Sequence, residues 1–217
     1  MTTFRQHMTE MADRVLAEFP QELTGEIYAV TFRIDSVDQD PRFPYLAIGY
    51  NTETDVAREF VQGGGTEPWE SRWHYAYFGP SGLDGIRVIG HDSAHDPVGA
   101  ELHRAESVAQ DLWYEDEDDD EDDGEGDDGL TEQEEDERGE ALAEQFHELC
   151  VDLARGLHAD GRLVAVLGRP VPVILYDMFD RDAMFALTRA ANPPELVTEF
   201  LSEDPQEQDP QGQDPQG

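Results

Sequence analysis

The chain has 217 residues and a formal net charge of −37 at pH 7. Because such a surface repels phosphate groups, the charge argues against nucleic acids and anionic membranes as partners. It favours a basic partner or simple solubility. All 14 basic side chains are arginine, so Schiff-base chemistry through a lysine is excluded. With a single cysteine, Cys150, no intramolecular disulfide can form.

The first predicted element is an amphipathic helix over residues 3–18. Its apolar side chains recur at helical spacing, and Phe19-Pro20 ends it, because the residue before a proline avoids the helical region. This stretch lacks the apolar core of a signal peptide. No apolar run approaches the roughly 18 residues that cross a bilayer, so we expect a cytoplasmic protein.

Two paired strands are predicted next. Residues 27–34 and 45–50 are rich in β-branched and aromatic side chains, and a turn-rich link joins them. The simplest arrangement is an antiparallel pair. Strand alternation then places one set of side chains on the core face of the first strand: Tyr28, Val30, Phe32 and Ile34.

Aromatic residues dominate the segment after a predicted helix over residues 53–62. Residues 72–78 are predicted to form a strand, and residues 86–89 a second short one. Because aromatic side chains dominate protein-binding surfaces, this segment supplies the candidate binding residues. Packing against the sheet is the alternative, since large aromatic side chains are usually buried. The candidates are Trp69, Trp73, Tyr75 and Tyr77.

Three histidines are the candidates for metal ligands. His91 and His95 lie four residues apart, and His103 follows on a helix predicted over residues 98–114. Histidines at this spacing bind one ion when they share a helical face, and nearby carboxylates would complete the coordination. The alternative is a polar loop, because a glycine and a proline frame the first two histidines. We assign no metal and expect no cofactor.

Two segments are predicted to be disordered. Residues 115–137 contain 17 acidic side chains and no basic one, and residues 204–217 repeat Asp, Pro, Gln and Gly. Neither segment carries enough apolar surface to offset its ordering entropy. The sequence therefore predicts one α+β domain over residues 1–203, interrupted by an acidic insert at 115–137 and followed by a tail at 204–217.

The longest predicted helix runs over residues 135–159. Its apolar stripe contains Cys150, which indicates a buried, inert thiol instead of a nucleophile. A strand over residues 171–176 follows, and its proline, Pro172, indicates either an edge position or the start of the strand. Helices are predicted over residues 181–191 and up to Leu201. The first two strands and the longest helix are expected to share one core: Tyr28, Phe32, Leu46, Ile48, Leu149 and Leu153.

No stretch carries a strong catalytic or nucleotide-binding signature. Gly63-Gly64-Gly65 follows a helix instead of a strand, and no Gly-Lys-Ser/Thr follows it, so it is not a phosphate-binding loop. No Gly-x-Ser-x-Gly motif is present. Acidic neighbours disfavour a thiolate at Cys150 paired with His147. We therefore assign no catalytic residue.

Four short motifs follow one another within residues 5–201. They are Ile27-Tyr28-Ala29-Val30-Thr31-Phe32, Gly49-Tyr50-Asn51-Thr52-Glu53, Trp73-His74-Tyr75-Ala76 and Arg189-Ala190-Ala191-Asn192-Pro193-Pro194-Glu195. In this order they resemble a bacterial family catalogued only as a domain of unknown function. The resemblance implies no catalytic residues. In chain length and general character, the family is similar to the small immunity proteins that accompany bacterial toxins. This comparison is an analogy.

The sequence as a whole predicts an α+β fold, with a small, mainly antiparallel sheet of about four strands and helices packed against it. The expected function is that of a non-enzymatic binding protein of the immunity type, which neutralises a basic partner. The alternative is a metal-dependent or hydrolase-like enzyme that uses His91, His95 and His103. The sequence leaves the oligomeric state open.

Overall fold

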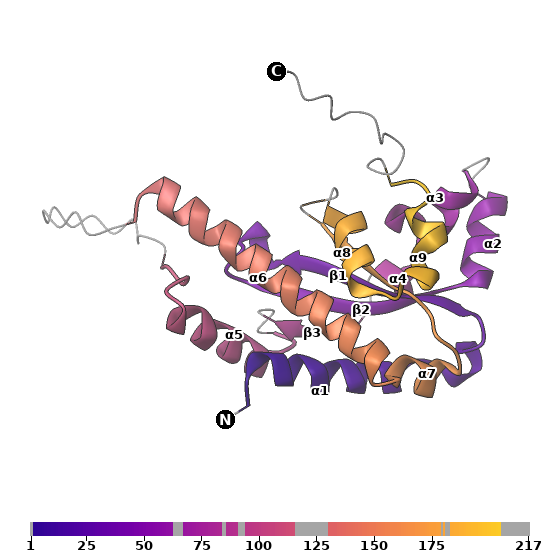
Figure 1. Cartoon of the computed structure of the whole chain (residues 1–217), viewed down its shortest axis with the longest axis horizontal. Coiled ribbons are helices and arrows are strands. Elements are labelled where there is room, and N and C mark those ends of the chain that lie inside the picture. Colours follow the sequence, from indigo (N-terminus) through magenta and orange to yellow (C-terminus); the bar gives the residue numbers. More distant parts are fainter. Residues whose placement is uncertain are drawn as a thin grey trace, which may run out of the picture.

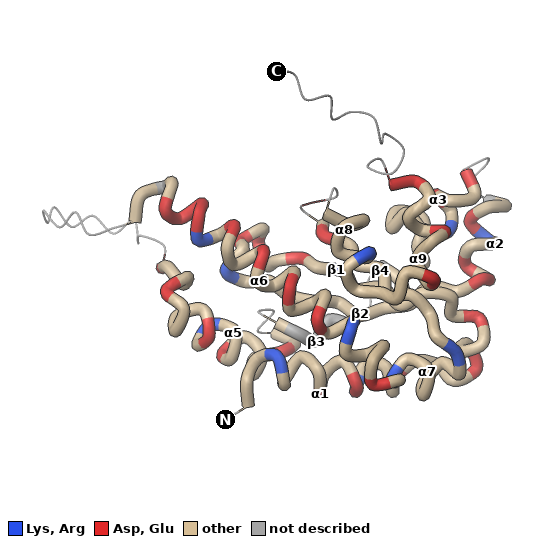
Figure 2. Tube along the Cα trace, in the orientation of Figure 1, with Lys and Arg blue, Asp and Glu red and all other residues tan. Residues whose placement is uncertain are grey.

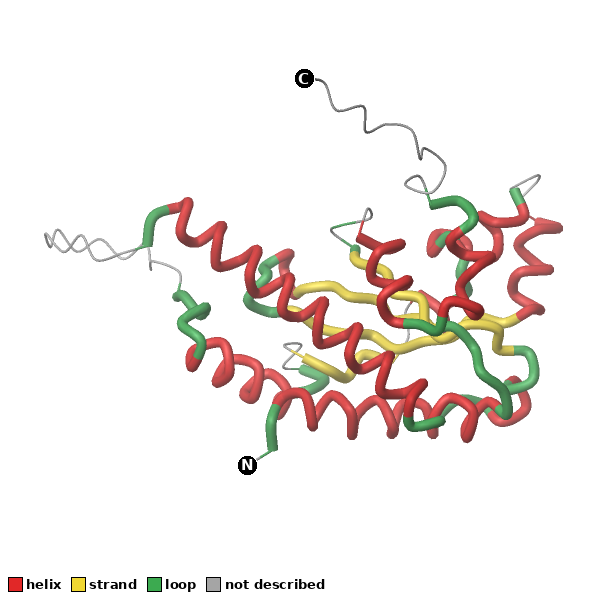
Figure 3. Tube along the Cα trace, in the orientation of Figure 1, coloured by secondary structure: helices red, strands yellow, loops and turns green. Residues whose placement is uncertain are grey.

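A computed structural model of the chain describes residues 2–62, 67–83, 86–90, 94–115, 130–178, 180 and 183–204. Its centre is a four-stranded sheet in the order β3-β2-β1-β4, and helices cover both faces (Figure 1 and Figure 3). This arrangement confirms the α+β class. The strands are β1 (Ile27–Ser36), β2 (Pro44–Thr52), β3 (Ile86–Gly90) and β4 (Val173–Asp177).

The sheet is mixed. β1 pairs antiparallel with β2, as predicted, and β2 pairs antiparallel with β3. β4 instead runs parallel to β1, with Val30 opposite Val173 and Phe32 opposite Leu175. A parallel connection needs a long crossover, and here helices of the described chain supply it. β4 forms an edge of the sheet, as the proline before it indicated.

The first helical layer covers one face of the sheet. α1 and α6 lie side by side across it (Figure 1). Phe32 is fully buried and belongs to one apolar cluster with Leu46, Ile48 and Leu153, and Leu149 packs against this cluster. These contacts confirm the predicted core between the strands and the longest helix. The helices of this layer are α1 (Phe4–Ala17), α5 (Pro97–Ala109), α6 (Glu132–Ala159) and α7 (Arg162–Leu167).

The second helical layer covers the opposite face of the sheet. It packs closely against β2 because residue 49 of that strand is a glycine. A Cβ atom at Gly49 would lie 2.1 Å from the Ser81 carbonyl oxygen. The Thr31 hydroxyl donates to the Gly82 carbonyl at 2.8 Å, so the same backbone turn is hydrogen-bonded to β1. The helices of this layer are α2 (Glu53–Gln62), α3 (Pro68–Trp73), α4 (Pro80–Leu83), α8 (Ala183–Ala191) and α9 (Pro194–Leu201).

Three short 3-10 turns complete the described elements and stand where the chain changes direction. They are η1 (Gln21–Leu23), η2 (Val37–Gln39) and η3 (Tyr75–Tyr77). The turn η2 joins β1 to β2 and contains Asp38 with a φ of 53°. A short polar residue such as aspartate tolerates this left-handed conformation better than most.

Tyr28 does not join the core in which it was predicted. The register between β1 and β2 shifts between Ile27 and Ala29. Such a bulge adds a residue to one strand and interrupts the alternation of side chains. Tyr28 therefore lies in a second apolar cluster, which also contains Trp73, Phe78, Tyr176 and Phe200. Its ring meets the Trp73 ring edge-on at 5.3 Å between centroids.

The prediction of a strand over residues 72–78 is wrong. This segment forms the end of α3 and then η3. Pro68 at the start of α3 suits a first helical turn, because the N–H that proline lacks has no partner within the helix there. Trp69 and Trp73 are four residues apart and therefore neighbours on one helical face.

The predicted end of the acidic insert at residue 137 is also wrong. α6 already begins at Glu132, and Thr131 and Glu134 cap it reciprocally. The Glu134 N–H donates to Thr131 Oγ1 at 3.3 Å, and the Thr131 N–H donates to Glu134 Oε2 at 2.9 Å. Acidic residues in the first turn also suit the positive end of the helix dipole. Residues 116–129 lie outside the described residues.

The tail does not begin at residue 204 as predicted. Asp204 is 1% exposed and accepts a hydrogen bond from Arg189 Nη2 at 2.5 Å. A buried carboxylate held by an arginine belongs to the folded part of the chain. Residues 205–217 lie outside the described residues.

The helix predicted over residues 98–114 ends earlier, at Ala109. Asp111 has a φ of 60°, which a helix cannot continue through. Trp113 therefore follows in a non-helical segment, where its ring packs edge-on against Phe43 with 5.6 Å between centroids.

Candidate functional site

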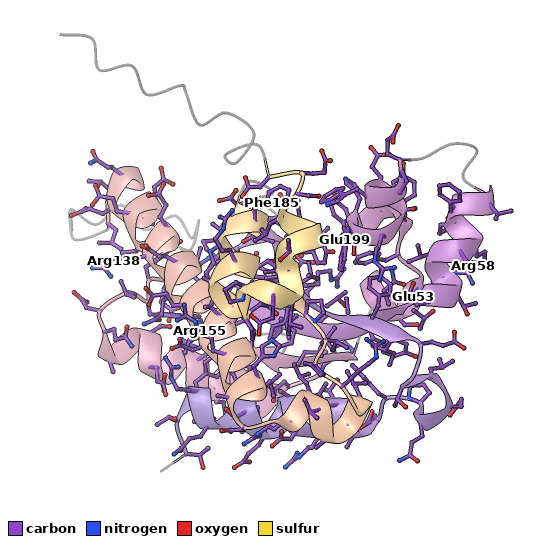
Figure 4. The ribbon with its side chains drawn as sticks, turned by 45° about the vertical axis from the view of Figure 1, so that its right-hand side comes forward. Glu53, Arg58, Arg138, Arg155, Phe185 and Glu199 are labelled. Atoms are coloured by element: carbon purple, nitrogen blue, oxygen red, sulfur yellow. The ribbon has the colours of Figure 1, made fainter. Side chains whose placement is uncertain are left out.

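A pocket of about 750 Å³ lies beside the edge strand β4, between α3 and α8. Figure 4 shows Phe185 and Glu199 on the neighbouring helices α8 and α9, on the side of α3. The volume falls in the range of small-molecule and peptide-anchor pockets. We call it the aromatic pocket, and its lining residues are Glu67, Pro68, Trp69, Glu70, His74, Tyr75, Tyr176, Asp177, Met184, Phe185 and Glu203.

The Trp69 wall is fixed from two sides. The indole Nε1–H donates to the Phe200 carbonyl at 2.9 Å. The ring stacks against Phe185, with 6.1 Å between centroids, and packs against Phe200 at 6.0 Å. Because its polar atom is already satisfied, Trp69 presents an apolar aromatic surface to the pocket.

The Tyr176 wall is fixed in the same manner. Its hydroxyl donates to the Trp73 carbonyl at 2.7 Å, and its ring meets Tyr75 edge-on at 6.2 Å and Phe78 at 5.4 Å. Burial raises the pKa of the Tyr176 hydroxyl well above its usual value, so the group stays neutral. The walls on both sides are therefore aromatic, uncharged and held in place before any ligand arrives.

The charged side chains among the described residues that line the aromatic pocket are all carboxylates. Glu67 and Glu70 stand at the start of α3, and Glu203 follows α9. Asp177 ends β4 and is 9% exposed. Carboxylates beside aromatic faces form the combination that binds cations, by ion pairing and by cation–π contact.

Asp177 is positioned by two further groups. His147 Nε2, on α6, is hydrogen-bonded to Asp177 Oδ2, and the Asp180 N–H donates to Asp177 Oδ1 at 2.8 Å. A second cavity, of about 630 Å³, shares Asp177 with the aromatic pocket and is lined also by Asp35, Glu140 and His147. Asp177 therefore stands between two hollows whose charged side chains are predominantly acidic.

The predicted binding residues occupy different positions. Trp69 and Tyr75 line the aromatic pocket. Trp73 is 3% exposed and packs in the second core cluster, so it supports the wall from behind. Tyr77 is half-buried and meets the ring of His74 at 5.8 Å between centroids.

Sequence reasoning missed the residues that β4, α8 and the end of α9 bring to the pocket. Tyr176, Asp177 and Phe185 lie more than a hundred residues after Trp69 in the chain. Nothing local in their sequence sets them apart from ordinary strand and helix residues. The one usable signal was the acidic residue that ends a buried strand, Asp177.

The candidate metal ligands do not form a cluster in the described part of the chain. His95 is exposed in the turn before α5, and His103 is 2% exposed, with its ring edge-on to Phe4 at 5.2 Å. His91 lies outside the described residues. The described residues contain no group of three or more His, Cys, Asp or Glu side chains suited to hold a metal ion.

Cys150 is fully buried on α6, as predicted. Burial is the main cause that raises the pKa of its thiol far above the usual value, and the nearby Asp177 carboxylate adds to it. A nucleophilic thiolate needs an open, electropositive setting. Cys150 therefore contributes packing to the first core cluster.

Comparisons with known proteins find no relative of this chain. No protein-family model, no curated protein and no solved structure matches it. Within the described residues, no helix combines the length and apolar character needed to cross a membrane. The resemblance to a bacterial family of unknown function remains a prediction from the short motifs.

Proposed function

We propose that this chain is a non-enzymatic cytoplasmic binding protein that holds a basic polypeptide partner at the aromatic pocket. The observation that carries the proposal is the lining: every charged side chain that lines the pocket among the described residues is a carboxylate, set beside fixed aromatic walls. A basic segment would find there both an apolar surface and opposite charge.

The charge of the whole chain supports the same partner. Acidic residues are spread along the helices in both layers, with fewer arginines between them (Figure 2). A net charge of −37 attracts a basic protein over a distance and raises its rate of association. The pocket then supplies the short-range contacts that long-range electrostatic attraction does not provide.

Binding of a basic peptide tests the proposal. An arginine- and lysine-containing Gly-Ser peptide should bind in isothermal titration calorimetry, whereas a glutamate-containing twin should not. The triple variant Glu67→Gln/Glu70→Gln/Glu203→Gln should weaken binding by about tenfold or more, because it removes the rim charges of the pocket.

A matched control separates the pocket from general electrostatics. Glu18→Gln/Glu22→Gln/Glu148→Gln removes the same number of charges from exposed positions that do not line the aromatic pocket. We expect this control to bind almost as the native chain does. Equal losses in the two triple variants would contradict a role for the pocket.

The partner that we propose is a toxin, which the chain neutralises as immunity proteins do. Co-expression provides the test. Products of genes adjacent to the one that encodes this chain should inhibit growth alone and be harmless when the native chain is present. Protection that persists in the pocket triple variant would contradict neutralisation through this site.

A further inference from the structure

Several arginine side chains of this protein are held by the same pair of groups. Arg72 lies over the Tyr28 ring, with 4.0 Å between the guanidinium carbon and the ring centre. Its Nη1 and Nη2 atoms donate to the two carboxylate oxygens of Glu53, each at 2.8 Å. One aromatic face and one carboxylate together therefore form an arginine site.

The same pair of groups recurs elsewhere in the chain. Arg104 lies 4.8 Å from the centre of a Trp113 ring and donates to Glu115 at 2.5 Å. Arg42 lies 4.6 Å from the centre of the Tyr114 ring and is paired with an aspartate two residues earlier. The second and third sites adjoin each other at Trp113 and Tyr114, and the Arg72 site lies apart from them in the second layer, so two parts of the fold use one chemistry.

The aromatic pocket offers both groups of such a site. Trp69 and Phe185 supply aromatic faces that are already fixed, and Glu67, Glu70 and Asp177 supply carboxylates in the same lining. No arginine lines the pocket among the residues that the structure describes. An arginine from another polypeptide would complete the arrangement.

We propose that the aromatic pocket selects arginine over lysine in its basic partner and is the anchor site for one partner arginine. This inference rests on the proposed function, since it names the side chain that the pocket takes. A guanidinium is planar, weakly hydrated and able to donate two parallel hydrogen bonds, so it stacks on an aromatic ring while it pairs with a carboxylate. A lysine ammonium is a compact, strongly hydrated charge that gains less from the aromatic walls.

A pair of peptides measures this selectivity. One is an arginine-containing Gly-Ser peptide with blocked ends, and the other is its lysine twin of equal charge. The arginine peptide should bind about tenfold more tightly. NMR titration follows both peptides, and the Trp69 indole N–H signal should shift with the arginine peptide.

Variants of the walls test the cause. Trp69→Leu should reduce the affinity for the arginine peptide to that for the lysine peptide, whereas Trp69→Phe, which keeps an aromatic face, should preserve the preference. Trp113→Leu is the control, because Trp113 does not line the pocket. If Trp69→Leu fails to fold, Phe185→Leu gives the same test on the ring that stacks against Trp69.

The outcomes separate this inference from the proposed function. Equal affinity for the two peptides, with both lost in Glu67→Gln/Glu70→Gln/Glu203→Gln, overturns arginine selection but leaves the proposed function standing. A preference for arginine that survives Trp69→Leu in a folded protein also overturns the inference. If neither peptide binds, or if binding ignores the pocket carboxylates, both proposals are wrong.

Discussion

Arg72, on α3, ties two other helices of the second layer to the sheet. It stacks on Tyr28 of β1, pairs with Glu53 of α2 and lies 3.5 Å from a carboxylate oxygen of Glu199 on α9. Its side chain is 21% exposed, so water screens these contacts only in part. We expect Arg72→Gln to lower the free energy of unfolding by about 1–2 kcal/mol in urea denaturation at pH 7.

The pH dependence of this loss identifies its cause. Hydrogen bonding to Arg72 lowers the pKa of the Glu53 carboxyl in the folded state. A lowered folded-state pKa stabilises the protein above the unfolded-state pKa, and this stabilisation is lost as the pH falls through the folded-state value. The difference between the native chain and Arg72→Gln should therefore shrink on acidification. Arg58→Gln is the control, because Arg58 is 44% exposed and its ion pairs, with Asp55 and Glu59, lie within its own helix α2.

Gly49 permits the closest contact between β2 and the second layer. A Cβ atom there would lie 2.1 Å from the Ser81 carbonyl oxygen and 2.9 Å from Thr31 Oγ1. The nearer atom belongs to the backbone, so α4 must move as a unit. We expect Gly49→Ala to destabilise the fold by roughly 1–3 kcal/mol, measured by thermal unfolding.

Gly25 provides the matched control for this substitution. A Cβ atom at Gly25 meets no other atom within 4 Å. Gly25→Ala should therefore leave the melting temperature close to that of the native chain. If both variants melt alike, the contact between β2 and α4 is looser than the structure describes.

At the scale of elements, the capping box of α6 decides where the acidic segment gives way to helix. Thr131→Ala removes the acceptor for the Glu134 N–H and should cost about 0.5–1 kcal/mol. The side chains of the first helical turns are largely exposed, so the loss should fray these turns and leave Leu142 and later residues protected. Hydrogen exchange of backbone amides measures the fraying of the first turns and the protection of the later ones. A uniform loss of protection along α6 would contradict this prediction.

The elements that could be predicted from sequence are those whose own pattern decides their structure. The pairing of β1 with β2 follows from two apolar runs and a turn, and α6 follows from its long apolar stripe. The start of α6 shows two signals in conflict: the acidic composition predicts disorder up to residue 137, whereas the capping-box spacing of Thr131 and Glu134 favours the helix that forms.

The aromatic segment shows where such reasoning fails. Aromatic residues favour strands by propensity, yet Pro68 and the four-residue spacing of Trp69 and Trp73 favour the helix that forms. The pocket itself could not be predicted, because β4 and α8 reach α3 only through the tertiary fold. Its acidic and aromatic chemistry was visible in sequence, but the partners that turn it into a pocket were not.

At the scale of the whole molecule, the sheet separates two apolar clusters. The first lies toward α1 and α6 and contains Phe32 and Leu153, and the second lies toward α3, α8 and α9 and contains Tyr28. The aromatic pocket opens on the second side, and its walls are continuous with that cluster through Phe200. A change in the first cluster should therefore reach the pocket through the sheet or through α6, whose His147 is hydrogen-bonded to Asp177.

Double-mutant cycles across the sheet test this division. Phe32→Ala should cost roughly 2–5 kcal/mol, because Phe32 is fully buried in the first cluster, and Leu153→Ala should cost less because its site is not completely enclosed. Two residues of one cluster share packing neighbours, so the double variant should depart from additivity by about 0.5 kcal/mol or more. Tyr28→Phe combined with Leu153→Ala should instead be additive, because the bulge in β1 turns Tyr28 to the other face. Guanidinium denaturation of the single and double variants gives these energies. Coupling between Tyr28 and Leu153 as large as that between Phe32 and Leu153 would mean that the sheet does not divide the core.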